Sequence, residues 1–210
     1  MRRAALAALG AALLAPPAPA QEAAAEARAR RIEARHRRST DLVARFTQTY
    51  RSGMLGRELV ETGTLSVKPP GRMLWQYEKP EKKTFVADGS TFYFYVPADR
   101  QVIVRQQAGE HGLPALLLSG RSDILREFAV TAELAPGGRE RLRLVPRRDD
   151  PEVQVVFLEA DEQDRIRGIE VVDTQGNRSR FRFDDVRENV GLKDALFRFK
   201  VPAGVEVVKG

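Results

Sequence analysis

The chain has 210 residues, no cysteine and a formal net charge of +6 at pH 7. The length fits one ordinary domain, and the lack of cysteine excludes both a disulfide framework and a lipid-modified N-terminal cysteine. Lys and Arg alternate with Asp and Glu along most of the sequence, and the densest basic run, 28–38, lies on a predicted helix. This is typical of solvated faces, so we expect no nucleic-acid partner.

The first twenty residues have the features of an export signal. Arg2-Arg3 precedes the apolar run 4–14, and Ala18-Pro19-Ala20 supplies small residues before a cleavage site between Ala20 and Gln21. The apolar run is shorter than the roughly 20 residues that a membrane-spanning helix needs. The prolines that follow it disfavour a buried helix. We therefore expect residues 1–20 to be a signal peptide and residues 21–210 to form a single domain.

Periodicity predicts a helix followed by many short strands. Residues 22–38 are rich in Ala, Glu and Arg, which favour a helix, and Ile32 is their main large apolar residue. From residue 41 to residue 50 the period changes to two, which predicts a half-buried strand with Phe46 on its apolar face. The same alternation predicts further strands at 58–68, 73–77, 84–87, 91–96, 128–134, 140–145, 153–159, 168–173 and 178–183, with a last piece at 197–199 before the tail 205–208.

The connections between these strands indicate an antiparallel meander. Asp88-Gly89 is a tight-hairpin signal, and Pro- or Gly-containing turns separate the later strands. Residues 113–120 read as a short apolar helix between breakers. Ser122-Asp123 can cap another brief turn through Arg126.

The aromatic stretch 63–97 is the most informative part of the chain. Met73, Trp75 and Tyr77 alternate on one strand face, while the consecutive large residues 92–96 make both faces of their strand bulky. One of those faces can close the core. The other can meet a helix, a partner or a ligand, and a strand buried on both sides is an equal alternative.

Groups for catalysis are sparse. His36 and His111 have no partner at a spacing that predicts a metal site. The acidic pairs 149–150 and 184–185 fall at predicted turns and strand ends, where solvated carboxylates are common. No nucleophile elbow or phosphate loop is present. The sequence therefore predicts a protein that is not an enzyme and needs neither metal nor cofactor.

With these elements in place, the sequence resembles the LolA family of lipoprotein carriers. The resemblance runs over nearly the whole mature chain. Its matching pieces are Phe46-Thr47-Gln48, Gly63-Thr64-Leu65-Ser66-Val67-Lys68, Met73-Leu74-Trp75-Gln76-Tyr77 with Pro80, Val86-Ala87-Asp88-Gly89-Ser90-Thr91, Gly168-Ile169-Glu170, Asp173, Gly176-Asn177, Asn189, Phe197-Arg198-Phe199 and Pro202-Ala203-Gly204-Val205.

The resemblance implies an α+β fold, in which an incomplete, strongly curved antiparallel β-barrel covered by short helices encloses an apolar cavity. It implies a periplasmic chaperone that carries lipoproteins from the inner to the outer membrane. Its partners would be acylated lipoproteins, an inner-membrane lipoprotein-release ABC transporter complex and an outer-membrane lipoprotein receptor. The physics agrees, since burying acyl chains is worth about 0.8 kcal/mol per CH₂.

The resemblance also implies where cargo binds. The expected acyl-chain contacts are Met73, Trp75, Tyr77, Phe85, Phe92, Phe94, Leu116 and Leu117. Family members often place an Arg directly after Lys68, where this chain has Pro69, so Lys68 or Arg72 is expected to take over a role in cargo transfer. A plain core role is the alternative for each residue. A lipid-binding sensor or regulatory module of the same fold, and a carrier of another lipid, stay open as alternative functions.

Overall fold

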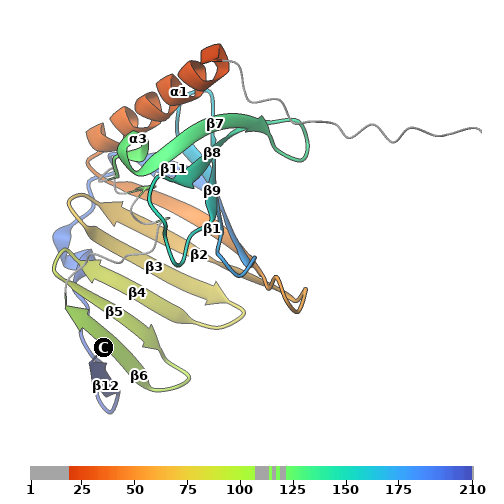
Figure 1. Ribbon diagram of the computed structural model, residues 1–210. Helices are drawn as coiled ribbons and strands as arrows, with labels where there is room; N and C mark the ends of the chain where they lie inside the picture. Colours follow the sequence, from red (N-terminus) through yellow and green to blue (C-terminus); the bar gives the residue numbers. More distant parts are fainter. Residues whose placement is uncertain (1–18, 107–113, 115–116, 119–121, 210) are drawn as a thin grey trace, which may run out of the picture.

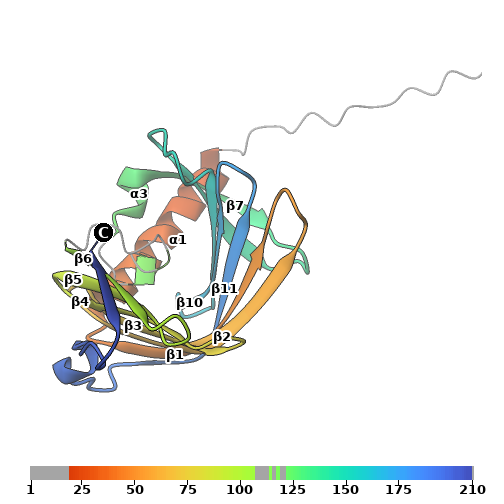
Figure 2. The same cartoon turned by 90° about the horizontal axis from the view of Figure 1, so that it is seen from below.

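The computed structural model describes residues 19–106, 114, 117–118 and 122–209. One antiparallel sheet dominates these residues and curls into an open, unclosed barrel (Figures 1 and 2). Its strand order is β12-β6-β5-β4-β3-β2-β1-β11-β10-β9-β8-β7. The incomplete, curved antiparallel barrel predicted from the sequence is confirmed.

The elements follow the chain in a simple order. The strands are β1 (Leu42–Arg51), β2 (Glu58–Lys68), β3 (Arg72–Lys79), β4 (Lys83–Asp88), β5 (Thr91–Val96), β6 (Gln101–Gln106), β7 (Phe128–Leu134), β8 (Glu140–Pro146), β9 (Val155–Ala160), β10 (Ile166–Val172), β11 (Arg178–Glu188) and β12 (Glu206–Lys209). The helices are α1 (Pro19–Arg38), α3 (Ile124–Glu127) and the 3₁₀ helix η1 (Asp194–Phe197).

The long helix α1 lies over one end of the curled sheet, where it packs on β7 and α3 (Figure 1). Its buried face is made of small residues with one larger one, Ala25, Ala29 and Ile32, so the helix approaches its neighbours closely. The helix begins at Pro19, three residues before the start predicted from composition. The predicted export signal falls almost entirely on residues 1–18, which lie outside the described residues. No helix in the described ranges is long and apolar enough to span a membrane.

Most predicted strands are confirmed, but three features of the sheet differ. The predicted strand piece 197–199 is wrong, because residues 194–197 form η1 and bury Phe197 against Leu74 and Val86. The expected tail instead contains β12, which pairs in parallel with the unpredicted strand β6. β11 continues five residues past its predicted end, because it stays paired with β1 up to Glu188. Asp185, with a positive φ of 52°, lies where the register of this pairing shifts. Asp184 and Asp185 therefore lie inside a strand and not at its end.

The C-terminal segment covers the convex side of the sheet, as Figure 2 shows for η1. Tyr93 and Tyr95 of β5 point to this side, where both rings contact Phe199 at 5.2 and 5.7 Å between centroids. One bulky face of β5 is thus covered by this chain's own C-terminal segment. The other face of β5 belongs to the concave side.

Asp41 fixes the start of that C-terminal segment. Its buried carboxylate accepts hydrogen bonds from the backbone N–H groups of Val190 (2.6 Å), Gly191 (2.9 Å) and Leu192 (2.8 Å). A charged acceptor that takes several N–H groups gives stronger bonds than neutral pairs do. Asp41 therefore ties the segment leaving β11 to the beginning of β1.

The main core fills the concave side of the curl. It joins apolar side chains from α1 and α3, from the described part of the 114–118 segment, and from β1, β2, β3, β4, β7, β8, β9, β10 and β11. Gly63 is required there, because a Cβ at this position would lie 2.0 Å from the Gln76 carbonyl oxygen and 2.8 Å from the Phe46 ring. The absence of a side chain leaves room for the Phe46 ring opposite Gly63 on β2.

Candidate functional site

The concave face carries a cluster of aromatic rings centred on Trp75. Its ring centroid lies 5.0 Å from that of Phe46, 5.4 Å from Phe181 and 6.2 Å from Phe183, and the first two contacts are edge-to-face. Register places them together, since Phe46 is opposite Phe183 across β1 and β11. Edge-to-face pairs add about 0.5–1.5 kcal/mol each beyond the area they bury. Trp75 is only 8% exposed, so this centre is well packed.

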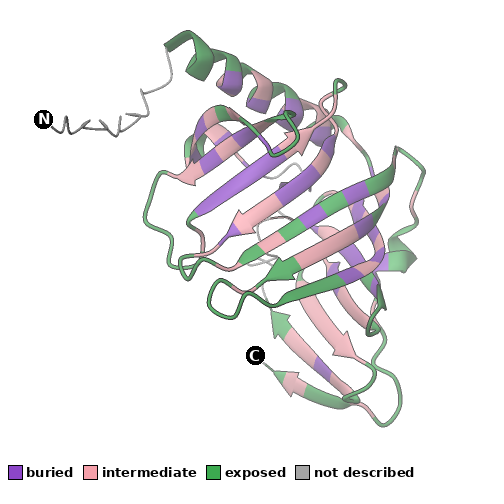
Figure 3. Cartoon of the chain, turned by 90° about the vertical axis from the view of Figure 1, so that its right-hand side faces the viewer, coloured by how far each residue is buried: buried purple, intermediate pink, exposed green. Residues whose placement is uncertain are grey.

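A second group of rings extends from this centre toward the open edge of the sheet. Phe85 lies opposite Trp75 in the β3–β4 register and contacts Tyr77 at 5.6 Å, Phe92 at 5.9 Å and Phe94 at 4.3 Å, the last as a stacked pair. Phe85, Phe92 and Phe94 are only partly buried. Every residue of β5 has intermediate exposure, whereas β3 carries the buried residues Met73, Leu74, Trp75 and Tyr77. Figure 3 colours the strands by this burial. The concave face therefore offers apolar surface mainly on β4 and β5.

Polar groups on this face are paired within the protein. The Tyr77 hydroxyl donates to Gln48 Oε1 at 2.6 Å, and Gln48 Nε2 donates to Ser179 Oγ at 3.0 Å. Lys83 Nζ lies 2.6 Å from the buried carboxylate of Glu61 and 4.4 Å from the centroid of the Tyr77 ring. Burial, and then the negative charge of Glu61, raises the pKa of the Tyr77 phenol well above its usual range, so the phenol stays neutral. These polar side chains are thus bonded to one another, and the two charged ones form an ion pair.

The described residues of the predicted apolar helix at 113–120 join the same core. Pro114, Leu117 and Leu118 are helical, and both leucines are buried in the main cluster with Trp75. Leu116, which was expected to contact cargo beside Leu117, lies outside the described residues. Leu117 is thus part of the main core, and its contact with cargo stays a prediction.

A cavity of about 500 Å³ opens beside these rings at the β10–β11 end of the sheet. Its apolar wall comes from Pro114, Val153, Val171 and Phe181, and its rim from polar residues of the loops. Phe181 also contacts Trp75, so the cavity reaches the edge of the central aromatic cluster. Its volume is in the range of pockets that hold small ligands, about 300–1,000 Å³.

Lys68 and Arg72 lie elsewhere, at the β2–β3 turn on the convex side. Lys68 Nζ and an Arg72 guanidinium nitrogen each lie 2.6 Å from the Asp194 carboxylate of η1, and Lys68 also donates to the Leu192 carbonyl at 2.6 Å. Hydrogen bonds from Lys68 and then Arg72 lower the pKa of Asp194. The structure therefore brings the two predicted basic residues together, but apart from the aromatic face.

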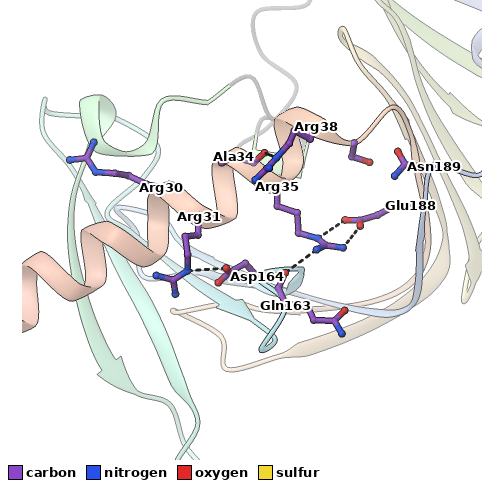
Figure 4. Close-up of a pocket in the computed structure, with 10 residues that line it drawn as sticks. Arg30, Arg31, Ala34, Arg35, Arg38, Gln163, Asp164, Glu188 and Asn189 are labelled. Carbon is purple, nitrogen blue, oxygen red and sulfur yellow. Dashed lines mark hydrogen bonds and ion pairs between the residues drawn. The ribbon is translucent and has the colours of Figure 1, made fainter.

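A polar cavity of about 640 Å³ lies along the C-terminal half of α1 (Figure 4). Arg31 Nε donates to Asp164 at 3.0 Å, and Arg35 Nε donates to Glu188 at 3.1 Å. The hydrogen bond to Glu188 raises the pKa of Arg35. Arg35 also donates to the Gln163 carbonyl at 3.1 Å. These arginines hold α1 to the sheet, which gives the basic run 28–38 a structural role. The walls of this polar cavity do not suit a hydrocarbon ligand.

Sequence reasoning did not assign Phe181, Phe183 and Gln48 to the site. Phe181 and Phe183 carry the same alternation that identified Met73, Trp75 and Tyr77, but they lie over a hundred residues away in the sequence. Only the β1–β11 pairing places them on one face with Phe46. In the described ranges, no group of three or more His, Asp and Glu residues could hold a metal ion.

Comparison with known proteins agrees with this geometry. The family model described as "Outer membrane lipoprotein carrier protein LolA" matches residues 37–200. An outer-membrane lipoprotein carrier protein of Chromohalobacter salexigens is 32% identical over 208 residues, covering 96% of this chain and 95% of the relative. Another, of Nitrosospira multiformis, is 33% identical over 155 residues, covering 72% of this chain and 75% of the relative.

A solved structure supports the fold independently. An uncharacterized conserved protein from Thermus thermophilus superposes with a TM-score of 0.54 at 18% sequence identity, covering 89% of this chain and 99% of that one. At this identity the likeness concerns the fold alone. The open curled sheet is thus an architecture that distant sequences share.

Proposed function

The chain belongs to the LolA family of outer membrane lipoprotein carrier proteins, and we propose that it holds the acyl chains of a lipoprotein against the aromatic concave face of its sheet. As a member of this family it is a periplasmic carrier of lipoproteins and not an enzyme. Residues 1–20 would direct export and be removed, leaving residues 21–210 as the carrier domain.

The observation that carries this proposal is the unequal burial of the aromatic face. Trp75 and Phe46 are buried in the centre, while Phe85, Phe92 and Phe94 keep exposed ring surface at the open side of an unclosed sheet. Each acyl CH₂ that leaves water is worth about 0.8 kcal/mol. Met73, Trp75, Tyr77 and Leu117 would then form the floor and cover of the site, and Leu116, which lies outside the described residues, stays an expected cargo contact.

The internal pairing of the polar groups beside the central rings, Tyr77 with Gln48 and Lys83 with Glu61, suits a carrier. A cargo held by burial alone is released when a more apolar or better fitting site is offered, whereas a buried ion pair would raise the cost of release. We propose that loading comes from an inner-membrane release complex of the ABC transporter class and that an outer-membrane receptor takes the cargo. Lys68 and Arg72, which are half-buried and both paired with Asp194 of η1, would act in that transfer.

The test is a solubility experiment with protein purified from the periplasm. A triacylated lipoprotein in detergent is mixed with the carrier, the detergent is removed, and the soluble fraction is measured after centrifugation. We expect the lipoprotein to stay soluble in a one-to-one complex, and the non-acylated form of the same lipoprotein not to bind. Precipitation of the lipoprotein despite excess carrier, or equal binding of both forms, would contradict the proposal.

A further inference from the structure

The hairpin that joins β1 and β2 projects from the molecule (Figure 1), and its turn carries two exposed apolar side chains. Met54 is 91% exposed and Leu55 is 67% exposed. Glycines flank the pair, at positions 53 and 56. Two adjacent large apolar residues at the tip of a projecting turn are unusual on a soluble surface, where apolar residues normally occur singly.

Four backbone N–H groups of this tip, those of Ser52, Gly53, Leu55 and Gly56, are already paired within the protein. The N–H groups of Ser52 and Gly56 bond to the carbonyls of Arg57 and Ser52, each at 3.0 Å. The N–H of Leu55 bonds to Ser52 Oγ at 3.2 Å, and that of Gly53 to Asn177 Oδ1 at 3.0 Å. Moving the turn into an apolar medium would therefore leave few backbone donors unpaired, which is the main cost of inserting a loop into lipid.

The charges beside the tip select an anionic surface. Arg51 and Arg57 stand on either side of the turn and are exposed, and within the described ranges neither guanidinium has an ion-pair partner. Glu58 is the acidic residue next to them, so the turn keeps an excess of positive charge. Each Arg near an anionic leaflet is attracted to it, and its long side chain can reach the headgroups while the tip sits deeper.

The tip also stands beside the opening of the apolar cavity. Gly53 packs so closely on the β10–β11 turn that a Cβ would lie 2.7 Å from the Gly176 backbone. Thr174 and Gln175 of that turn, with Ser179, line the rim of the cavity whose wall includes Phe181. Contact of the tip with a bilayer would bring this opening to the membrane surface.

We propose that Met54 and Leu55 insert into the headgroup boundary of an anionic phospholipid bilayer and dock the carrier with its cavity opening against the membrane. The proposed carrier function explains why the protein would dock on a membrane. The membrane binding itself requires no cargo and can be tested without it. A second copy of this chain or a membrane protein are the competing occupants of the tip.

Cargo-free protein is tested by co-sedimentation with vesicles of phosphatidylethanolamine and phosphatidylglycerol, and with vesicles of phosphatidylcholine alone. The variants are the double substitution Met54→Asp/Leu55→Asp, the charge variant Arg51→Gln/Arg57→Gln, and the control Leu134→Asp, which changes another exposed side chain (72%) on the β7–β8 hairpin. We expect the tip variant to lower the partition coefficient on anionic vesicles at least tenfold, the charge variant several-fold, and the control less than twofold. Phosphatidylcholine vesicles should bind the wild type weakly.

The depth of insertion of the tip is measured with the variant Met54→Trp. The fluorescence of the new indole should shift to the blue on vesicle binding and be quenched by brominated acyl chains, whereas the buried Trp75 should not be quenched. Binding of the tip variant equal to wild type, equal losses in the Leu134 control, or no vesicle binding by wild type would overturn the proposal. So would a concentration-dependent dimer that the tip variant dissolves. Because the substituted residues are exposed, melting temperatures should change little. The lipoprotein solubility experiment is scored separately, so failure of docking leaves the carrier function standing.

Discussion

Adjacent residues of β5 allow binding to be separated from stability. Phe94 points to the concave face and stacks on Phe85 at 4.3 Å, whereas Tyr95 points to the convex side and contacts Phe199 at 5.7 Å. Both are partly buried and each makes one ring contact of this kind. Phe94→Ala and Tyr95→Ala are therefore matched in what they remove from the fold and differ in the face from which they remove it.

The expected magnitudes follow from the geometry. A fully buried Phe→Ala change costs about 3–5 kcal/mol, and partial exposure reduces this to roughly 2 kcal/mol for either variant, or a fall of about 4–8 °C in Tm for a domain of this size. If cargo covers about a third of the 150–250 Å² that an aromatic side chain can bury, it removes about 60 Å² of Phe94 from water. At about 25 cal/mol per Å² this is roughly 1.5 kcal/mol, or a tenfold rise in Kd.

The assay pairs thermal unfolding with displacement of a fluorescent fatty acyl probe from the purified carrier. We expect the two variants to have similar Tm values, a probe Kd raised about tenfold in Phe94→Ala, and a Kd within twofold of wild type in Tyr95→Ala. A probe affinity unchanged by Phe94→Ala at equal Tm would refute the assignment of the concave face. Equal weakening in both variants would show that affinity follows stability and not contact.

Other predictions address the support of the site. Asp41→Asn should destabilise the fold by about 2–3 kcal/mol, because an amide oxygen replaces a charged acceptor of three N–H groups, and hydrogen exchange at residues 190–192 should speed up; unchanged exchange would contradict this anchoring. Burial lowers the pKa of His36, while the charge of Glu188 and the nearby Leu118 backbone oppose the shift and Arg35 adds to it. Neither ring nitrogen makes a well-aligned hydrogen bond among the described residues. As the pH falls, the imidazole of His36 is therefore protonated in the unfolded chain before it is protonated in the folded one. This favours the unfolded chain, so the free energy of unfolding decreases as the pH falls below about 6.5. His36→Leu should reduce the difference in unfolding free energy between pH 7.5 and pH 5, and an unaltered difference would exclude His36 as its source.

Local sequence patterns predicted most of the sheet because its strands obey local rules. The alternation in β3 and the Asp88-Gly89 turn act over a few residues, and the structure confirms both: Asp88 Oδ1 accepts from the N–H groups of Ser90 and Thr91, and Gly89 has a φ of 106°. Capping by Asp123 was likewise readable, since its side chain accepts from the Arg126 N–H. Such signals need no knowledge of the distant chain.

The features that were missed depend on distant contacts. Alternation at Phe197 and Phe199 suggested a strand, but the ion pairs of Asp194 with Lys68 and Arg72, and burial of Phe197 on Leu74, hold a 3₁₀ turn instead. Those partners lie over a hundred residues away. The same holds for the site, because Phe181 joins Trp75 only through the order in which β1 pairs with β11 and β2.

The two bulky faces of β5 show how this fold separates its tasks. The convex face is covered by Phe199 from the chain's own C-terminal segment, so its aromatic surface contributes to stability at all times. The concave face keeps Phe92 and Phe94 partly exposed beside the buried centre at Trp75. Because β5 is held in place by contacts on its convex face, its concave face can keep apolar side chains partly exposed. Affinity for an acyl chain can then be low enough for release, because the free carrier does not depend on cargo to stay folded.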